Sequence, residues 1–239
     1  MHVFLARAGA GSRRAMEAAI RDGRVRIDGA VVQAMGMQVD PATVQVTLDG
    51  VPVVRSTADR VVMVVHKPVG VVTTASDPEG RETVLDLVPS HLRATRLYPV
   101  GRLDLMSEGL VLLTNDGDLA NQLMHPSFGH EREYEVEIRG DLPRGLPQRF
   151  SRGVAIGDPR PARAQVRAIT PTPGGTSLRL ILREGRNRQI RRMFESYGVA
   201  IRRLRRIRVA TVCLGDLPAG SARVLSAAER TELARLLNN

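Results

Sequence analysis

Short apolar or alternating segments, separated by turn residues, constrain the fold of this chain more than any other feature of its sequence. The clearest is 132–139, where Tyr134, Val136 and Ile138 recur at every second position, the period of a strand with one buried face. Further strands are predicted at 61–65, 71–74, 110–113, 164–169 and 177–182. Helices are predicted at 83–88, 119–124, 187–197 and 226–237. Because strands outnumber helices and many adjoin across turns, we expect an α+β fold with a mixed, mainly antiparallel sheet flanked by helices.

The first 54 residues predict a small α/β-rich domain, followed by a polar linker at 55–60 and a larger domain at 61–239. Ser12 can cap a helix that runs to about Asp22, after a shorter helix at 3–8. Asp-Gly dipeptides at 28–29 and 49–50 are turn signals between short alternating segments. Strands are predicted around these turns at 24–27, 30–32, 44–48 and 51–53. The N-terminal domain should therefore combine two helices with a small sheet.

The charge of the chain indicates a polyanionic partner. There are 35 Lys+Arg against 25 Asp+Glu, a formal net charge of +10, and Lys67 is the sole lysine. The arginines concentrate in two segments, with ten in 183–208 and six in 7–26, each against two acids. Two separate basic segments favour a nucleic acid that is held at two places; the alternative for each is a solvated helix face.

Several classes of protein are excluded. Cys213 is the single cysteine, so neither a disulfide framework nor a cysteine metal site can form within the chain. It lies in the apolar run 209–214, where we expect it to be a buried strand residue. His125 and His130 are the histidines closest in sequence, and their spacing across a Pro-Ser-Phe-Gly loop does not suit a metal. No apolar stretch approaches the roughly 18 residues of a membrane span, and the N-terminus lacks the apolar region of a signal peptide. We therefore expect a soluble, cytoplasmic protein without a metal.

The segment 101–117 carries the residue best suited to chemistry. It reads Gly-Arg-Leu-Asp-Leu-Met-Ser-Glu-Gly-Leu-Val-Leu-Leu-Thr-Asn-Asp-Gly, in which a polar turn with Asp104 and Arg102 precedes an apolar run at 110–113. That run is long enough for a buried strand, and 115–117 turns the chain after it. A carboxylate held on a turn against a rigid strand, beside a guanidinium, is suited to act as a nucleophile or a base.

This segment resembles the catalytic motif of pseudouridine synthases, in the branch that modifies ribosomal RNA, although Ser107 stands where that family more often has threonine. The segments 67–81, 132–134 and 184–194 resemble further motifs of the same family, in the same order along the chain. Residues 5–14 and 23–29 resemble the alpha-L (S4-like) RNA-binding module. Residues 119–127 and 131–134 look most like the enzymes of the large-subunit, 23S rRNA type. The resemblance implies a pseudouridine synthase catalytic domain that follows an RNA-binding domain.

The resemblance also implies roles for particular residues. Asp104 would be the residue on which the chemistry depends, Tyr134 would pack on the target base, and Arg191 would pair with Asp104. Contacts to RNA are expected from Arg102, Arg13, Arg14, Arg24, Lys67, Arg186, Arg188 and Arg192. The reaction is an isomerisation of uridine that needs no cofactor, and the target must be turned out of its stack. The expected partner is ribosomal RNA or a pre-ribosomal particle, bound by a monomer away from membranes.

Three alternatives remain open from the sequence. The first is a sister specificity for 16S rRNA, and the second is a non-catalytic protein of rRNA binding or ribosome assembly, which an exposed and unpaired Asp104 would favour. The third is a glycoside hydrolase that uses Asp104 and Glu108 as paired carboxylates. A basic chain with seven aromatic residues makes a poor carbohydrate site.

Overall fold

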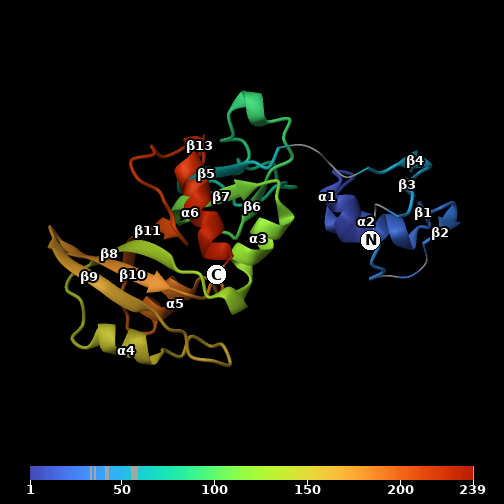
Figure 1. Cartoon of the computed structure of the whole chain (residues 1–239). Coiled ribbons are helices and arrows are strands. Elements are labelled where there is room, and N and C mark those ends of the chain that lie inside the picture. Colours follow the sequence, from blue (N-terminus) through green and yellow to red (C-terminus); the bar gives the residue numbers. More distant parts are fainter. Residues whose placement is uncertain (33, 35, 41–42, 55–58, 239) are drawn as a thin grey trace. The chain divides into compact units, whose positions relative to one another are not determined.

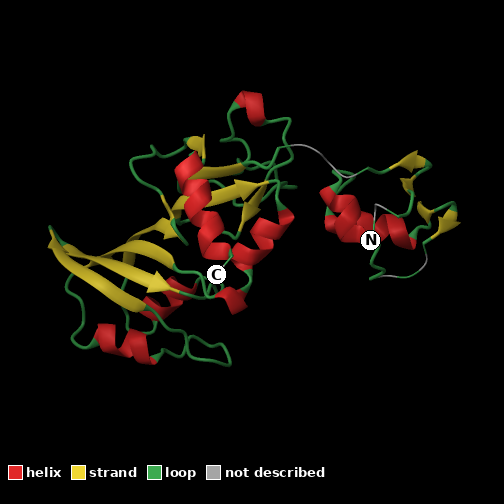
Figure 2. Cartoon of the chain, in the orientation of Figure 1, coloured by secondary structure: helices red, strands yellow, loops and turns green. Residues whose placement is uncertain are grey.

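The computed structural model describes residues 1–32, 34, 36–40, 43–54 and 59–238 (Figures 1 and 2). They form two compact units, Met1–Arg60 and Val61–Asn239. Of the linker predicted at 55–60, residues 55–58 lie outside the described residues. Over the described parts of the chain, no helix has both the length and the apolar character that a membrane span requires.

The first unit contains two helices and a four-stranded antiparallel sheet with the strand order β2-β1-β3-β4. The Ser12 hydroxyl accepts a hydrogen bond from the Ala15 amide at 3.0 Å, which confirms the predicted cap. Buried Leu5, Met16, Ile20 and Val25 form a core within this unit. Its elements are α1 (His2–Arg7), α2 (Arg13–Arg21), β1 (Val25–Ile27), β2 (Ala30–Val31), β3 (Val46–Leu48) and β4 (Val51–Pro52).

The second unit is built on a sheet with the strand order β13-β5-β7-β11-β8-β10-β9, to which β6 and β12 add at β7 and β11. All of its strand pairs are antiparallel except β7 with β11, which confirms the predicted mixed, mainly antiparallel α+β fold. The strands are β5 (Val62–Lys67), β6 (Tyr98–Val100), β7 (Glu108–Thr114), β8 (Arg132–Arg139), β9 (Gln165–Thr172), β10 (Gly175–Leu182), β11 (Ile201–Val209), β12 (Val212–Cys213) and β13 (Ala222–Val224). The helices are η1 (Ser90–Leu92), α3 (Gly117–Met124), η2 (Pro126–Phe128), α4 (Leu146–Arg152), α5 (Gln189–Glu195) and α6 (Ala227–Leu237).

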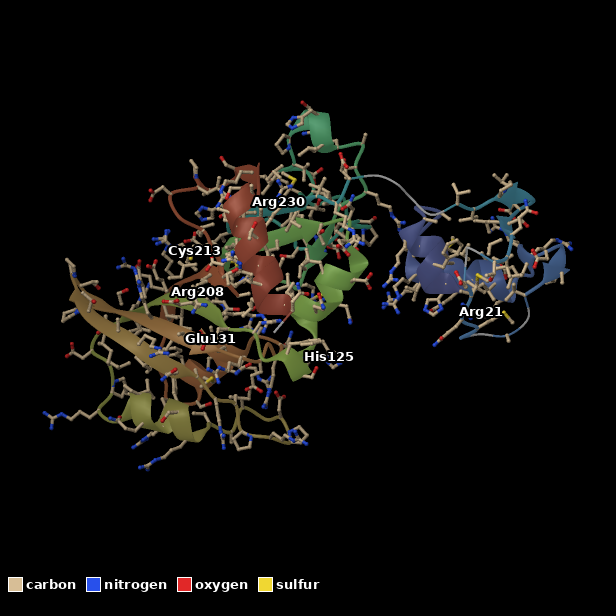
Figure 3. The ribbon with its side chains drawn as sticks, viewed as in Figure 1. Arg21, His125, Glu131, Arg208, Cys213 and Arg230 are labelled. Carbon is tan, nitrogen blue, oxygen red and sulfur yellow. The ribbon has the colours of Figure 1, made fainter. Side chains whose placement is uncertain are left out.

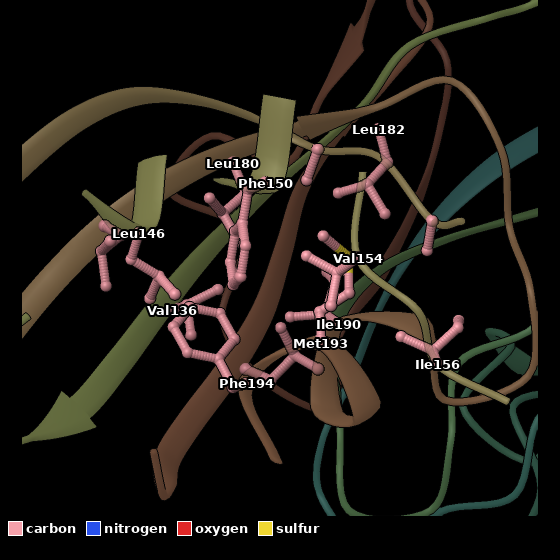
Figure 4. Close-up of a cluster of buried hydrophobic side chains, with 14 of the residues drawn as sticks. Val136, Leu146, Phe150, Val154, Ile156, Leu180, Leu182, Ile190, Met193 and Phe194 are labelled. Atoms are coloured by element: carbon pink, nitrogen blue, oxygen red, sulfur yellow. The ribbon is translucent and has the colours of Figure 1, made fainter. Parts of the chain in front are cut away.

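Strands β5 and β7 are buried on both faces, which explains why their sequences are continuous apolar runs. Leu110 and Leu112 pack on one face with residues of α3 and α6, and Val111 and Leu113 pack on the other face with residues from 71 to 103. A separate cluster lies between β8, β10 and the helices α4 and α5, where the rings of Phe150 and Phe194 meet edge to face (Figure 4). The loop that contains Asp104 therefore begins and ends in rigid, buried structure.

Some local predictions are wrong. Residues 71–74 contribute only a single bridge, between Val72 and Thr83, and 83–88 form turns instead of a helix. Cys213 is exposed, because the apolar run is split by a turn at 210–211 and the following strand turns Val212 inward (Figure 3). The strands β6, β11 and β13 and the helix α4 were not predicted at all.

Candidate active site

The loop between β6 and β7 holds Asp104 on an immobilised backbone. The Leu103 amide donates to the Thr73 hydroxyl at 3.2 Å, and that hydroxyl donates to the Leu103 carbonyl at 2.9 Å. The Ser107 amide donates to the Asp104 carbonyl at 3.0 Å and closes a four-residue turn. The Asp104 side chain is half-buried, and among the described residues its carboxylate has neither a hydrogen-bond donor nor an ion-pair partner. A fixed backbone thus presents a carboxylate whose oxygens are free.

Lys67 lies beneath this loop, at the end of β5, and the prediction that it contacts RNA is wrong. Its side chain is 0 % exposed, and its ammonium group donates to the carbonyls of Ser107 at 2.7 Å, Pro68 at 2.8 Å and Leu105 at 3.4 Å. Burial lowers the pKa of Lys67 to about 8, against the opposing effect of the Asp104 and Glu108 carboxylates. A buried ammonium group with three carbonyl partners cannot reach a phosphate, so its role is to fix the loop.

Arg191 reaches the same loop from α5. Its guanidinium donates to the Met106 carbonyl at 2.6 Å and lies 3.4 Å from the Ser107 hydroxyl. No ion pair joins Arg191 to Asp104 in the described structure, although the two interact at longer range. Burial lowers the pKa of Arg191 and the Asp104 carboxylate opposes this shift. Arg191 therefore secures the main chain of the loop, and its charge lies near the carboxylate without bonding to it.

Arg206 on β11 is a third cation at this loop, and the sequence did not single it out. It is 3 % exposed, and its guanidinium donates to the Leu110 carbonyl at 2.7 Å and to the Arg102 carbonyl at 3.4 Å. The close pairing of β7 with β11 requires Gly109, which has a φ of +108° and where a Cβ would lie 2.2 Å from the Arg206 carbonyl oxygen. The sequence offered no signal for Arg206, because the apolar residues Ile201, Leu204 and Ile207 of β11 recur at every third position and do not alternate as in a strand.

Tyr134 on β8 is brought to the same end of the sheet. It is the cross-strand partner of Arg206, and it packs against the apolar cluster that contains Leu103, the residue before Asp104. Its ring is half-buried, which leaves part of it accessible. The structure thus assembles Asp104, Tyr134 and Arg191 from three separate segments, together with Lys67 and Arg206.

Most of the other arginines between 183 and 208 are neutralised. Eight of the ten lie within ion-pair distance of a carboxylate, and the two without one among the described residues are Arg191 and Arg206. Figure 3 shows one such pair, Arg208 and Glu131, at 3.1 Å. Three of the predicted RNA contacts belong to this set: Arg186 with Glu184, Arg192 with Asp158 and, at 3.4 Å, the more exposed Arg188 with Glu195. Carboxylates compensate the charge of these paired arginines, which weakens the case for an RNA-binding patch here, and their contact with RNA stays a prediction.

The remaining arginines predicted to contact RNA differ from one another in whether a carboxylate pairs with them. Arg102, Arg13 and Arg14 are exposed, and none of them has a carboxylate partner among the described residues. Arg24 is exposed but pairs with Asp49, with 2.8 Å between its Nε and a carboxylate oxygen. Glu108 lies 2.5 Å from the guanidinium of Arg203, so it is not a free second carboxylate for glycoside hydrolysis.

Comparison with known sequences gives a consistent result. Residues 61–196 match the RNA pseudouridylate synthase family, and residues 2–44 match the S4 domain. The ribosomal large subunit pseudouridine synthase B of Bacillus subtilis is 36% identical over 98% of this chain and 95% of its own length. An uncharacterized RNA pseudouridine synthase of Mycobacterium leprae is 42% identical over 93% of this chain and 87% of its own length. The synthase B of Xanthomonas campestris is 43% identical over 90% of this chain, which spans only 44% of that protein.

A solved structure supports the fold. The crystal structure of a pseudouridylate synthase matches 97% of this chain and 98% of its own chain, with a TM-score of 0.68 and 24% sequence identity. At that identity the match shows a shared architecture.

Proposed function

The chain belongs to the RNA pseudouridylate synthase family, and on this premise we propose that it isomerises a specific uridine of ribosomal RNA to pseudouridine, with Asp104 as the catalytic residue. The names of the large-subunit relatives favour 23S rRNA as the substrate. The observation that carries the assignment of Asp104 is its free, half-buried carboxylate on a loop that Lys67, Arg191 and Arg206 hold in place. Asp104 is unpaired, as a protein that only binds RNA would allow, but it is half-buried on a fixed loop and not exposed, which favours the catalytic role.

The proposed reaction breaks the bond between N1 of uracil and C1′ of ribose, rotates the base and forms a bond between C5 and C1′. A proton leaves C5 and another is gained at N1, so neither oxidation nor an energy source is required. Asp104 acts either as a nucleophile that attacks the sugar or base, or as a base that removes the proton at C2′. A primary isotope effect with 2′-deuterated uridine would identify proton removal at C2′. Tyr134 packs on the turned-out base, which offsets part of the few kcal/mol that unstacking costs.

The N-terminal unit is proposed to supply phosphate contacts. Arg13 and Arg14 occupy the first turn of α2, which contains no acidic residue. Positive side chains at a helix N-terminus oppose the helix dipole, so helix stability does not explain their position. Backbone phosphate there would interact favourably with both the arginines and the free amides of the helix end. We expect residues 1–54 to act as an RNA-binding domain on ribosomal RNA or a pre-ribosomal particle, and the protein to act as a cytoplasmic monomer.

The test is tritium release from transcripts labelled at C5 of uridine, because the C5 hydrogen is lost only when the new bond forms. The protein should release tritium from 23S rRNA and not from 16S rRNA. Asp104→Asn should abolish release and leave RNA affinity nearly unchanged, since the substitution removes an interaction of the transition state. Turnover of this variant within tenfold of the unaltered protein contradicts the assignment of Asp104. Release from 16S rRNA alone contradicts the large-subunit specificity.

A further inference from the structure

Phe128 is an exposed aromatic side chain in a chain that has few of them. All seven phenylalanines and tyrosines are among the described residues, and of these only Phe128 has an exposed side chain, at 51%. The ring of His130 stacks against it, with 5.9 Å between centroids and 7° between planes, and the ring of His125 meets it edge-on at 6.1 Å. Single exposed apolar residues are common on protein surfaces, but an exposed planar ring held in a fixed orientation is a surface on which a base can stack.

The loop that contains Phe128 is held in one conformation. Its 3₁₀ turn, η2, runs from Pro126 to Phe128 and is closed by Gly129, which has a φ of +59°. The Phe128 amide donates to the His125 carbonyl at 3.2 Å, and the His125 ring nitrogen lies 2.6 Å from the Ser127 hydroxyl. The ring therefore requires little ordering when it binds a partner.

This loop is also fixed relative to the proposed active site. The sulfur of Met124, at the end of α3, accepts a hydrogen bond from the Gly101 amide at 3.0 Å, three residues before Asp104. Arg132, two residues before Tyr134, donates to the carbonyls of Leu123 at 3.1 Å and His130 at 3.4 Å. The segment that carries Phe128 is thus joined at its start to the Asp104 loop and at its end to the strand of Tyr134.

The surrounding charge indicates the chemistry of the partner. Arg102 is exposed beside Gly101, and neither Arg102 nor Arg132 forms an ion pair with any described residue. The nearby Glu131 is occupied by Arg183 and Arg208, which lower its pKa. An exposed planar ring, with the exposed and unpaired Arg102 on the adjoining loop, suits a polyanion with flat, unstacked groups, which is single-stranded RNA.

We propose that Phe128 is the stacking platform for an unpaired base of the substrate RNA that neighbours the target uridine. The proposal rests on the proposed function and extends it, since it assigns recognition of a second nucleotide to the loop between α3 and β8. A base stacked there would keep the RNA strand open beside the target.

The experiment first maps the uridine that the protein modifies in 23S rRNA, and then measures kcat/KM for tritium release on a fragment that carries it. Phe128→Ala should lower kcat/KM by roughly 5- to 150-fold, the range seen when one base loses an aromatic partner. Phe128→Trp should keep kcat/KM within about threefold of the unaltered protein. Phe128→Leu retains an apolar side chain but has no planar ring, so it should lower kcat/KM as much as Phe128→Ala does. The matched control is Ile169→Ala, which removes another exposed apolar side chain, 47% exposed on β9, and should change nothing. In a plot of log affinity against log salt, Phe128→Ala should have the same slope as the unaltered protein, because no phosphate contact is lost.

A second arm uses fragments with an abasic residue at each position within two nucleotides of the target. One of these should reduce the rate of the unaltered protein as Phe128→Ala does, and the two changes together should cost no more than either alone. Additive losses at every position, or a fully active leucine variant, overturn the stacking proposal and favour an apolar contact with a protein. If the unaltered protein released no tritium at all, the proposed function itself would be contradicted. Failure of the proposed function can therefore be distinguished from failure of the stacking proposal.

Discussion

Three cationic side chains converge on the main chain of one loop. Lys67, Arg191 and Arg206 each donate to carbonyl oxygens between residues 102 and 110, and none of them has a carboxylate within ion-pair distance among the described residues. Buried charge is unfavourable unless it is compensated, so an arrangement of this kind is not explained by stability. Its consequence is a concentration of positive charge at the Asp104 loop, which favours an approaching phosphate backbone.

The buried ammonium of Lys67 predicts a pH dependence of stability. Its pKa falls from the ordinary 10.5 to about 8 in the folded protein, so between these values the unfolded chain binds a proton that the folded protein has lost. The contribution of Lys67 to the free energy of unfolding should therefore increase as pH rises from about 8 to 10.5. Denaturant titrations of the unaltered protein and of Lys67→Met should diverge across this window, since only the former titrates there. Parallel pH profiles would show that Lys67 has an ordinary pKa.

Arg206 is expected to position Asp104 through the carbonyl of Arg102. Arg206→Lys keeps the charge but cannot donate from two nitrogens to Leu110 and Arg102 at once. We expect kcat for tritium release to fall at least tenfold while KM changes by less than threefold. Arg205→Lys is the control, because Arg205 is adjacent on β11 and pairs with Glu135 away from the loop. An equal loss in both variants would indicate general damage to the strand.

At the scale of elements, β8 and β11 form a ladder of ion pairs. Glutamates at every second position of the segment 131–137 line one face of β8, and Tyr134, Val136 and Ile138 line the other. Arginines of β11 face these glutamates in register, with Arg205 opposite Glu135 and Arg203 opposite Glu137. Cross-strand pairs of opposite charge stabilise a sheet, so much of the basic charge of the chain is structural.

This ladder and α2 should differ in their contribution to RNA binding. Replacing Arg13 and Arg14 by alanine should reduce the slope of log affinity against log salt by about 1.4 to 1.8 in total, with a smaller loss of saturated rate. Replacing Arg205 and Arg208 by glutamine should leave the slope unchanged and lower the free energy of unfolding by roughly 0.2–1 kcal/mol for each half-buried ion pair that is lost. A slope that falls equally in both double variants would show that the ladder opens to bind RNA.

At the scale of the whole molecule, each unit has its own core. The residues of the first unit pack in one apolar cluster, and the second unit contains three others. The fragment 61–239 should therefore fold alone, with a cooperative thermal transition, and should act on a short RNA at high concentration. Its salt slope should be smaller than that of the full chain by roughly 0.7 to 0.9 for each phosphate contact removed. An unchanged slope would mean that the first unit is not an RNA clamp.

The sequence by itself determined features that depend on local order along the chain. Alternation places β8 at 132–139, Ser12 marks the start of α2, and the motif around Asp104 identifies both the family and the loop. Such signals arise from neighbours in sequence, because side chains two residues apart share a strand face and a capping hydroxyl bonds within its own turn. The strand β11 was not predicted, because arginines occupy strand positions at which apolar side chains usually indicate a buried strand.

Only the tertiary structure decided which charges are free. Lys67 looked available to phosphate but is buried against the Asp104 loop, and Arg186 and Arg192 are paired through Asp158 and Glu184. Arg206 is one of ten arginines in its segment of the sequence, yet it is one of two with no carboxylate partner in the described part of the chain. The physical reason is that compensation of a charge depends on distance in space, and the β8 glutamates lie about 70 residues away in sequence from the arginines that they neutralise.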